Sequence, residues 1–254
     1  MGRLEGRIAI ITGGGSGIGR SSSILFAKEG AKVVVACRSA EAGEETVRMI
    51  EGIPGQATYI KTDVSKTDDV KELIRKTVKT YGKLNILVNN AGISREEVSI
   101  VDCTEDIFDE IMAVNFRGVW LGMKYAIPEI LRAGGGSIVN ITSTCAVEGI
   151  RGMGIYSGSK GAVTSLSRVA AMEYADTNIR VNCVLPGNIA TPMFTSHWSP
   201  EGIERIKSIS PTKRLGQPEE VAQAILFAAS DESSWMTGQV VFAEGGITAL
   251  QPGF

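Results

Sequence analysis

Tyr156 and Lys160 lie four residues apart in the stretch YSGSK, at the start of a segment with a helical pattern. Because a helical turn takes about 3.6 residues, the two side chains share one face of that helix. A free phenol has a pKa near 10, but an adjacent ammonium stabilises the phenolate and lowers this pKa. A shift of about three units requires ~4 kcal/mol, which close positive charges can supply. The pair therefore predicts a general acid and base for proton transfer.

The stretch ITGGGSGIGRS, residues 11–21, predicts a site for a phosphate group. A strand, a glycine-rich turn and a helix N-terminus direct backbone N–H groups and the helix dipole at an anion. The fingerprint G-x-G-x-x-G fits no register of these glycines, and a P-loop nucleotidase requires lysine where Arg20 stands. The pattern T-G-x-x-x-G-x-G does fit, through Thr12, Gly13, Gly17 and Gly19. A glycine-rich turn without a ligand is the plain structural alternative.

Short β-rich runs alternate with longer helical patterns along the chain. Several runs are apolar on consecutive residues, which is typical of strands buried on both faces of a parallel sheet. The expected strands begin near residues 7, 32, 57, 85, 137, 180 and 239. The expected helices cover residues 17–29, 40–50, 68–82, 104–131, 156–174 and 218–229. The alternation predicts an α/β fold, a doubly wound parallel sheet of about seven strands flanked by helices.

No linker, low-complexity tract or internal repeat interrupts the sequence, so we expect a single domain over residues 1–254. The longest stretch without a clear strand or helix runs from Pro186 to about Gln217. Long irregular segments in compact domains are often functional lids. We therefore expect a substrate lid around residues 188–215.

Composition excludes several classes of partner. The chain is 43% apolar and 21% charged, with a net charge of -2 and no basic tract, which disfavours nucleic-acid binding. Its cysteines form no C-x-x-C pair, so we expect neither a metal site nor a disulfide framework, and a cytoplasmic location fits. No apolar run approaches the ~20 residues of a membrane span, and the N-terminus lacks the apolar core of a signal peptide.

Taken together, these motifs resemble the short-chain dehydrogenase/reductase family. After the glycine loop come NNAG at residues 89–92, Asn115 in AVNFRGVW, and Ser143 thirteen residues before Tyr156, and then PG at residues 186–187. The resemblance covers essentially the whole chain. It implies a Rossmann-type oxidoreductase that interconverts a ketone and a secondary alcohol with NAD(P), and that assembles as a homotetramer.

The resemblance also implies the catalytic residues Asn115, Ser143, Tyr156 and Lys160. Tyr156 would act as general acid in reduction and as base in oxidation, while Ser143 would hold the carbonyl oxygen. Lys160 would lower the pKa of Tyr156 and bind the nicotinamide ribose. Asn115 would hold a water that links Lys160 to solvent.

The adenosine end of the site favours NADP over NAD. In a dinucleotide fold, an acid at the end of the second strand binds the ribose 2′-OH, whereas a nearby arginine accommodates a 2′-phosphate. Cys37 stands in that place and Arg38 follows it. A basic residue in place of Ser16 would have strengthened the assignment, and a merely solvated Arg38 is the structural alternative. The residues expected to hold the cofactor are Gly13, Ser16, Gly17, Ile18, Gly19, Arg38, Ser39, Asp63, Val64, Asn90, Ala91, Gly92, Tyr156, Lys160, Pro186, Gly187, Ile189 and Thr191.

The substrate is expected to be a small carbonyl compound or alcohol with an apolar body. The residues expected to contact it are Ser143, Cys145, Met153, Tyr156 and His197, with Val147 and Gly154 flanking the same space. A 3-oxoacyl carrier-protein reductase is the alternative substrate class, and sugar and steroid alcohols stay open. A dinucleotide-binding sensor without turnover is the alternative function, because a fold does not fix an activity.

Overall fold

The computed structural model describes residues 2–95 and 98–249 and centres on a parallel sheet. Seven strands form this sheet in the order β3-β2-β1-β4-β5-β6-β7. They are β1 (Ile8–Thr12), β2 (Lys32–Cys37), β3 (Gln56–Lys61), β4 (Ile86–Asn89), β5 (Gly136–Ile141), β6 (Ile179–Pro186) and β7 (Val240–Ala243). The predicted α/β class, with a doubly wound parallel sheet of about seven strands, is confirmed.

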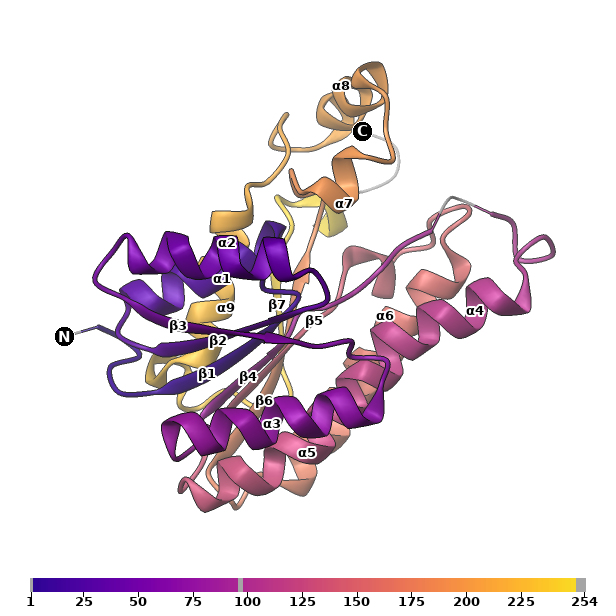
Figure 1. The fold of residues 1–254 in the computed structure, drawn as a ribbon. Helices are drawn as coiled ribbons and strands as arrows, with labels where there is room; N and C mark the ends of the chain where they lie inside the picture. The colour runs from indigo at the N-terminus through magenta and orange to yellow at the C-terminus, as the bar shows by residue number, and fades with distance from the viewer. Residues whose placement is uncertain (1, 96–97, 250–254) are drawn as a thin grey trace.

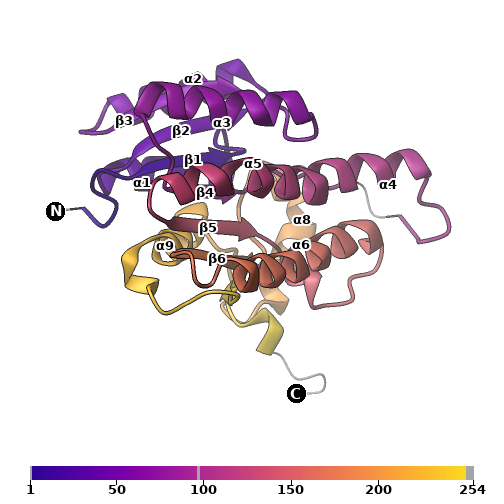
Figure 2. The same ribbon diagram turned by 90° about the horizontal axis from the view of Figure 1, so that it is seen from below.

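Helices cover both faces of the sheet (Figures 1 and 2). One layer holds α1 (Gly17–Lys28), α2 (Ala40–Glu51) and α9 (Pro218–Ala229), and the other holds α3 (Thr67–Tyr81), α5 (Gly118–Arg132) and α6 (Gly154–Glu173). The remaining helices are α4 (Glu105–Met112), α7 (Pro192–Thr195) and α8 (Pro200–Ile209). Short 3-10 turns occupy Thr144–Ala146, Asp231–Ser233 and Ile247–Ala249.

Alternate residues of the central strands enter two separate cores. Ile11 of β1 packs with Phe26 and Ile225 on one face of the sheet. The adjacent Ile10 packs with Leu73 and Val163 on the other face. Both faces are apolar because both carry helices, which explains why the strands read as continuous apolar runs rather than alternating ones.

The strand order reverses between β1 and β4. Ile10 of β1 pairs with Val34 of β2 on one side and with Leu87 of β4 on the other. The connections after β1 and β4 therefore run to opposite sides of the sheet, which makes the carboxyl ends of these two strands a topological switch point. Such a switch point is where open α/β sheets bind ligands.

Two of the predicted segments differ from the structure. The helix expected over residues 104–131 consists of α4, a π-helical turn at Ala113–Arg117, and α5. The stretch expected to be irregular, Pro186 to Gln217, contains α7 and α8. Each helix has a proline in its first turn and a hydroxyl N-cap, from Thr191 and Ser199. These two features favour a helix start even where the helical pattern of apolar residues is too short to predict one.

Candidate active site

The glycine loop joins β1 to α1 at the switch point. Gly13 and Gly17 have φ angles of 65° and 49°, in the left-handed region that favours glycine. A Cβ on Gly19 would overlap the carbonyl oxygen of Gly13, so the helix can start this close to the strand only without a side chain there. The loop therefore requires glycine at these three predicted positions for backbone reasons.

The start of α1 offers backbone donors to an anion. Its N-cap, Ser16, makes no side-chain capping bond, and Arg20 N donates to Ser16 O at 3.0 Å as the helix begins. The preceding N–H groups, from Gly17 to Gly19, are those that a helix leaves without intrahelical partners. Thr191 lies across the loop, since a Cβ on Gly17 would sit 3.1 Å from its Cγ2. These features fit the pyrophosphate of a dinucleotide.

The side chain of Arg20 does not take the place of a P-loop lysine. Its Nε donates to Thr46 Oγ1 at 3.1 Å, and its guanidinium also reaches Ala42 O, so it is bound to α2. A P-loop lysine must instead reach the bound phosphates. The arrangement therefore favours the dinucleotide interpretation over the nucleotidase one.

The NNAG stretch is tied to the glycine loop through a buried threonine. Thr12 Oγ1 accepts the N–H groups of Asn90 and Ala91, each at 3.0 Å. The Asn90 amide returns a bond to Thr12 O at 2.9 Å. Deeper in the sheet, Asn89 donates to Asn140 of β5 at 2.8 Å. The ends of β1, β4 and β5 are thus held in fixed register beneath the site.

Tyr156 and Lys160 share one face of α6, as their spacing predicts. Lys160 Nζ lies 5.8 Å from the centroid of the Tyr156 ring and donates to Ile141 O at 2.9 Å. The lysine is only 4% exposed. A Cβ on Gly92 would lie 3.4 Å from both Lys160 Nζ and Asn115 Oδ1, so both polar atoms lie close to Gly92.

Asn115 lies in the π-helical turn and is fully buried. Its Oδ1 accepts Ile93 N at 2.8 Å, and its Nδ2 donates to Ile93 O at 2.9 Å. The same Nδ2 donates to Ser159 Oγ at 3.2 Å. Single π turns inside helices are frequent at functional sites, and here the turn carries the amide that joins the loop after β4 to α6.

Ser159 belongs to this site although the sequence analysis did not identify it. Its hydroxyl donates to Tyr156 O at 2.7 Å and accepts from Asn115, and its side chain is fully buried. A small polar residue three positions after Tyr156 and next to Lys160, on the buried face of the helix, was the available signal.

Ser143 lies two residues after the end of β5 and caps the 3-10 turn that leads toward α6. Its Oγ accepts Cys145 N at 3.3 Å, which fixes the side chain beside the phenol. Burial raises the pKa of Tyr156 to about 12, a negative charge on Cys145 adds to this rise, and the hydrogen bond with Ser143 opposes it. Burial also lowers the pKa of Lys160 to about 8. In the protein alone burial is therefore the dominant influence, and the lowering of the Tyr156 pKa expected from Lys160 together with a nicotinamide cation stays a prediction.

The residues predicted to bind the adenosine part of the cofactor also lie near one another. Cys37 Sγ donates to Ser39 O at 3.2 Å and would lie 2.9 Å from a Cβ on Gly15, so the thiol faces the glycine loop. Arg38 is exposed beside it, and Ser39 caps α2 by accepting Ala42 N at 3.2 Å.

Asp63 and Val64 complete this end from the loop after β3. Burial disfavours ionised Asp63, but hydrogen bonds from Ser65 and the charges of Arg38 and Lys66 hold its pKa below the ordinary value. The carboxylate and the Arg38 guanidinium therefore flank the same space. Val64 is buried against Gly118, where a Cβ would come within 2.9 Å of Val64 Cγ2.

The segment after β6 closes the opposite side. Pro186 ends the strand, and a Cβ on Gly187 would lie 2.9 Å from Glu244 Cα. Ile189 is buried and forms a β-bridge with Gly216, so both ends of the segment that carries α7 and α8 are held together. Thr191, at the start of α7, lies over Gly17.

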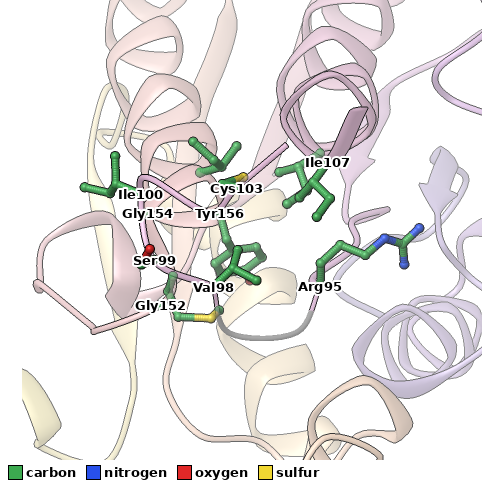
Figure 3. A pocket seen from close by; sticks show the side chains of 12 residues that line it. Arg95, Val98, Ser99, Ile100, Cys103, Ile107, Gly152, Gly154 and Tyr156 are labelled. Carbon is green, nitrogen blue, oxygen red and sulfur yellow. The ribbon is translucent and has the colours of Figure 1, made fainter. Parts of the chain in front are cut away.

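The predicted substrate residues are only partly brought together. Met153, Gly154 and Tyr156 line one cavity (Figure 3), but Ser143, Cys145 and His197 are not among its described lining residues. His197 is exposed between α7 and α8, where its Nδ1 lies 2.5 Å from Met193 O. Among residues 2–95 and 98–249, no three His, Cys, Asp or Glu residues cluster as metal ligands, and no helix is long and apolar enough to cross a membrane.

Comparison with known proteins places the chain among oxidoreductases. Residues 13–248 match a family model described as enoyl-(acyl carrier protein) reductase. A 3-oxoacyl-acyl-carrier-protein reductase of Thermotoga maritima is 42% identical over 245 residues, covering 96% of this chain and 99% of that protein. A cyclohexanol dehydrogenase of Acinetobacter sp. is 39% identical over 247 residues and covers 97% of each chain.

A solved structure agrees with these sequence matches. The crystal structure of levodione reductase superposes with a TM-score of 0.95 at 32% identity, covering 98% of this chain and 100% of that one. The chain therefore belongs to the short-chain dehydrogenase/reductase family.

Proposed function

We propose that the protein is an NADP-dependent oxidoreductase that interconverts a ketone and a secondary alcohol, with Tyr156 as the general acid and base. The observation that carries the proposal is the array of half-buried Tyr156 with buried Lys160, Asn115 and Ser159 at the sheet switch point, opposite the glycine loop. No part of this array is needed for a fold of this type, because a hydrophobic helix face would pack as well.

Reduction of a ketone needs a hydride at the carbonyl carbon and a proton at the oxygen. The hydride comes from the bound nicotinamide dinucleotide. Tyr156 donates the proton, and its raised pKa of about 12 keeps that proton in place at neutral pH. Ser143 holds the carbonyl oxygen. In the oxidative direction Tyr156 accepts the proton, which requires positive charge nearby to stabilise the phenolate.

Lys160 and Asn115 support this proton transfer. The Lys160 ammonium binds the nicotinamide ribose and stays mostly charged at neutral pH, since its pKa is about 8. Its contact with Ile141 O fixes the direction of the side chain. Asn115 holds the backbone of Ile93. It also binds a water that connects Lys160 to solvent.

NADP is the favoured dinucleotide, with NAD as the alternative. Cys37 removes the carboxylate that would repel a 2′-phosphate, and the exposed Arg38 guanidinium can pair with it bidentately. Arg38 lies close enough to Asp63 to lower its pKa, which is consistent with a position beside the adenosine pocket.

A 3-oxoacyl-acyl-carrier-protein reductase is the second candidate, favoured by the 42% identical relative of that name. The cyclohexanol dehydrogenase at 39% identity supports a free alicyclic alcohol instead. Fluorescence titration with NADPH and NADH, followed by a panel of ketones, alcohols and acetoacetyl-CoA assayed at 340 nm, tests these alternatives. Turnover with NADPH supports the proposal. NADPH binding without turnover of any compound would instead support a dinucleotide sensor.

We extend the proposal to a single domain over residues 1–254, with a lid around residues 188–215, and to a cytoplasmic homotetramer. Free thiols at all four cysteines are compatible with a reducing compartment. Exposed apolar side chains on the α4–α5 and α6 surfaces suit subunit contacts: Phe108, Trp120, Leu131, Val169 and Met172. Light scattering coupled to size exclusion tests the assembly, and a monomer would contradict it.

A further inference from the structure

The π-helical turn at Ala113–Arg117 separates α4 from α5 and makes contacts toward both ends of the predicted cofactor site. The N–H of Gly118 donates to Ala113 O, five residues earlier, which is the hydrogen bond that defines a π turn. Such turns are rare and occur mostly singly, at functional sites. Contacts outside the helix hold this one, and they come from two of its side chains, Asn115 and Arg117.

Arg117 holds the loop that follows β3. Its Nη1 donates to Ser65 O at 2.5 Å, and its Nη2 donates to Thr67 Oγ1 at 2.9 Å. The two donors belong to one planar, rigid guanidinium, so the bonds fix the direction as well as the distance between the loop and the turn. The side chain is exposed, so these contacts rather than core packing set its position.

The loop held by Arg117 carries the residues predicted to bind the adenine. Asp63 Oδ1 accepts both the N–H and the hydroxyl of Ser65, at 3.1 and 2.7 Å. Val64 packs against Gly118, directly after the π turn, where an added Cβ would come within 2.9 Å of Val64 Cγ2. A movement of the turn relative to this loop would therefore displace both predicted adenine contacts.

On the other side of the turn, Asn115 holds the catalytic array. Its amide bonds to the backbone N–H and C=O of Ile93 and to the Ser159 hydroxyl. That hydroxyl in turn donates to Tyr156 O. Because successive helical residues are about 100° apart around the axis, a return of the turn to the α-helical register would break the bonds of either Asn115 or Arg117.

We propose that Arg117 is a positioning residue, through which adenosine bound at the loop after β3 holds Asn115 and Tyr156 in place for proton transfer. This inference rests on the proposed function, which supplies the reaction at Tyr156. The adenosine half of the dinucleotide then raises the rate of reduction and not only the affinity for the cofactor. Binding energy from a part of the substrate that does not react is used in this way when it stabilises the reactive arrangement.

A cofactor divided into two fragments separates rate from affinity. Reduced nicotinamide mononucleotide carries the hydride but no adenosine, and adenosine 2′-phosphate carries the other half without a 5′-phosphate that would compete for the same place. With cyclohexanone as substrate, saturating adenosine 2′-phosphate should raise kcat for the mononucleotide by at least about fivefold, the lower end of the usual coupling between two sites. Adenosine is the fragment used if the wild type prefers NADH. Absence of activation in the wild type would overturn the proposal.

Arg117→Met removes both bonds to the loop and should abolish this activation. Arg75→Met is the matched control, because Arg75 is an exposed guanidinium on α3 that binds Glu72 and has no contact with the π turn. The control should be activated like the wild type, and both variants should unfold at similar temperatures. Equal activation of Arg117→Met and the wild type would contradict the positioning role.

Thr67→Val is a second, independent variant. It keeps the shape of the side chain and removes only the acceptor for Arg117 Nη2. Activation should fall to a level between those of the wild type and Arg117→Met, and the double variant should lose no more than Arg117→Met, since both substitutions act on one contact. Additive losses would count against the proposal. If NADPH reduces ketones and Tyr156 is required, but the fragment gives no activation, the role of Arg117 fails while the proposed function stands.

Discussion

Asn115 and Ser159, 44 residues apart in the chain, are joined by a buried hydrogen bond of 3.2 Å from the amide to the hydroxyl. The Ser159 hydroxyl in turn donates to the backbone carbonyl oxygen of Tyr156 at 2.7 Å. These hydrogen bonds hold the π-helical turn and the start of α6 at a fixed separation. The loop after β4 is held in the same arrangement. Ser159 is a positioning residue: it contacts the supports of the phenol rather than the reacting atoms.

Ser159→Ala should lower kcat about tenfold, which corresponds to ~1.4 kcal/mol of transition-state stabilisation. The free energy of unfolding should fall by about 1–2 kcal/mol, because the Asn115 amide loses one buried partner. Ser157→Ala is the matched control on the same helix. Ser157 Oγ is buried without a partner among the described residues, so its removal should leave kcat and stability unchanged or improve stability. Steady-state kinetics and urea unfolding of both variants measure the difference, and equal effects would contradict the positioning role.

Lys160→Met should abolish turnover and stabilise the fold. Burial lowers the pKa of Lys160 to about 8, whereas the unfolded chain titrates near 10.4. At pH 7 both states carry the proton and the folded state bears the cost of a buried charge. Removing that charge, less the lost bond to Ile141 O, should raise the free energy of unfolding by about 1–3 kcal/mol.

The pH dependence follows from the same shift. Between about pH 8 and pH 10.4 the unfolded chain binds a proton that folded Lys160 has released, so this residue makes stability rise with pH in that window. The Lys160→Met variant should lack this increase of stability with pH. Thermal unfolding of both proteins at pH 7 and pH 9.5 gives the comparison, and a variant that is less stable than wild type at pH 7 would contradict a buried ammonium.

Arg38→Ala should raise the Kd for NADPH by about 10- to 100-fold, since a charge-assisted bond to a phosphate contributes ~1.5–3 kcal/mol. The Kd for NADH should change little. Arg48→Ala, which removes an exposed cation paired with Glu45 on α2, should affect neither. Fluorescence titrations distinguish these outcomes, and comparable affinity of the wild type for both dinucleotides would show that Arg38 is only a surface charge.

Gly19→Ala should weaken binding of both dinucleotides strongly, because its Cβ would overlap Gly13 O and force the loop away from α1. Gly158→Ala on α6 has open space around the added methyl group and should stabilise the helix by about 0.5–1 kcal/mol. Isothermal titration and thermal unfolding provide both readouts. Tight NADPH binding by Gly19→Ala would show that the loop tolerates a side chain there.

Regular strands and helices, and glycines whose backbone angles end them, can be predicted from the sequence. Irregular turns that depend on distant contacts cannot. Ile10 and Ile11 enter opposite cores, so their consecutive apolar character predicts a strand covered on both faces. The φ angle of 81° at Gly82 ends α3 where the sequence places its end. In contrast, the π turn at Asn115 depends on contacts with Ile93 and Ser159, which lie far away in the chain.

Tertiary environment also explains the remaining differences in the site. The spacing of Tyr156 and Lys160 predicts their shared face, but it carries no information on burial, which sets the direction of both pKa shifts. His197 has the residue type of a substrate ligand, yet its imidazole contacts Met193 O in the turn after α7. The cavity beside Tyr156 arises from three segments whose contact no local pattern predicts.

Tyr156→Phe tests the central claim most directly. The variant keeps the ring and loses only the hydroxyl, so the fold and the glycine loop should be unaffected. NADPH should bind with the wild-type Kd, while single-turnover oxidation of NADPH by cyclohexanone, followed at 340 nm, should slow by about 10²–10⁴-fold for loss of the proton donor. Wild-type rates in Tyr156→Phe, with the same Kd, would contradict the assignment of Tyr156 as general acid.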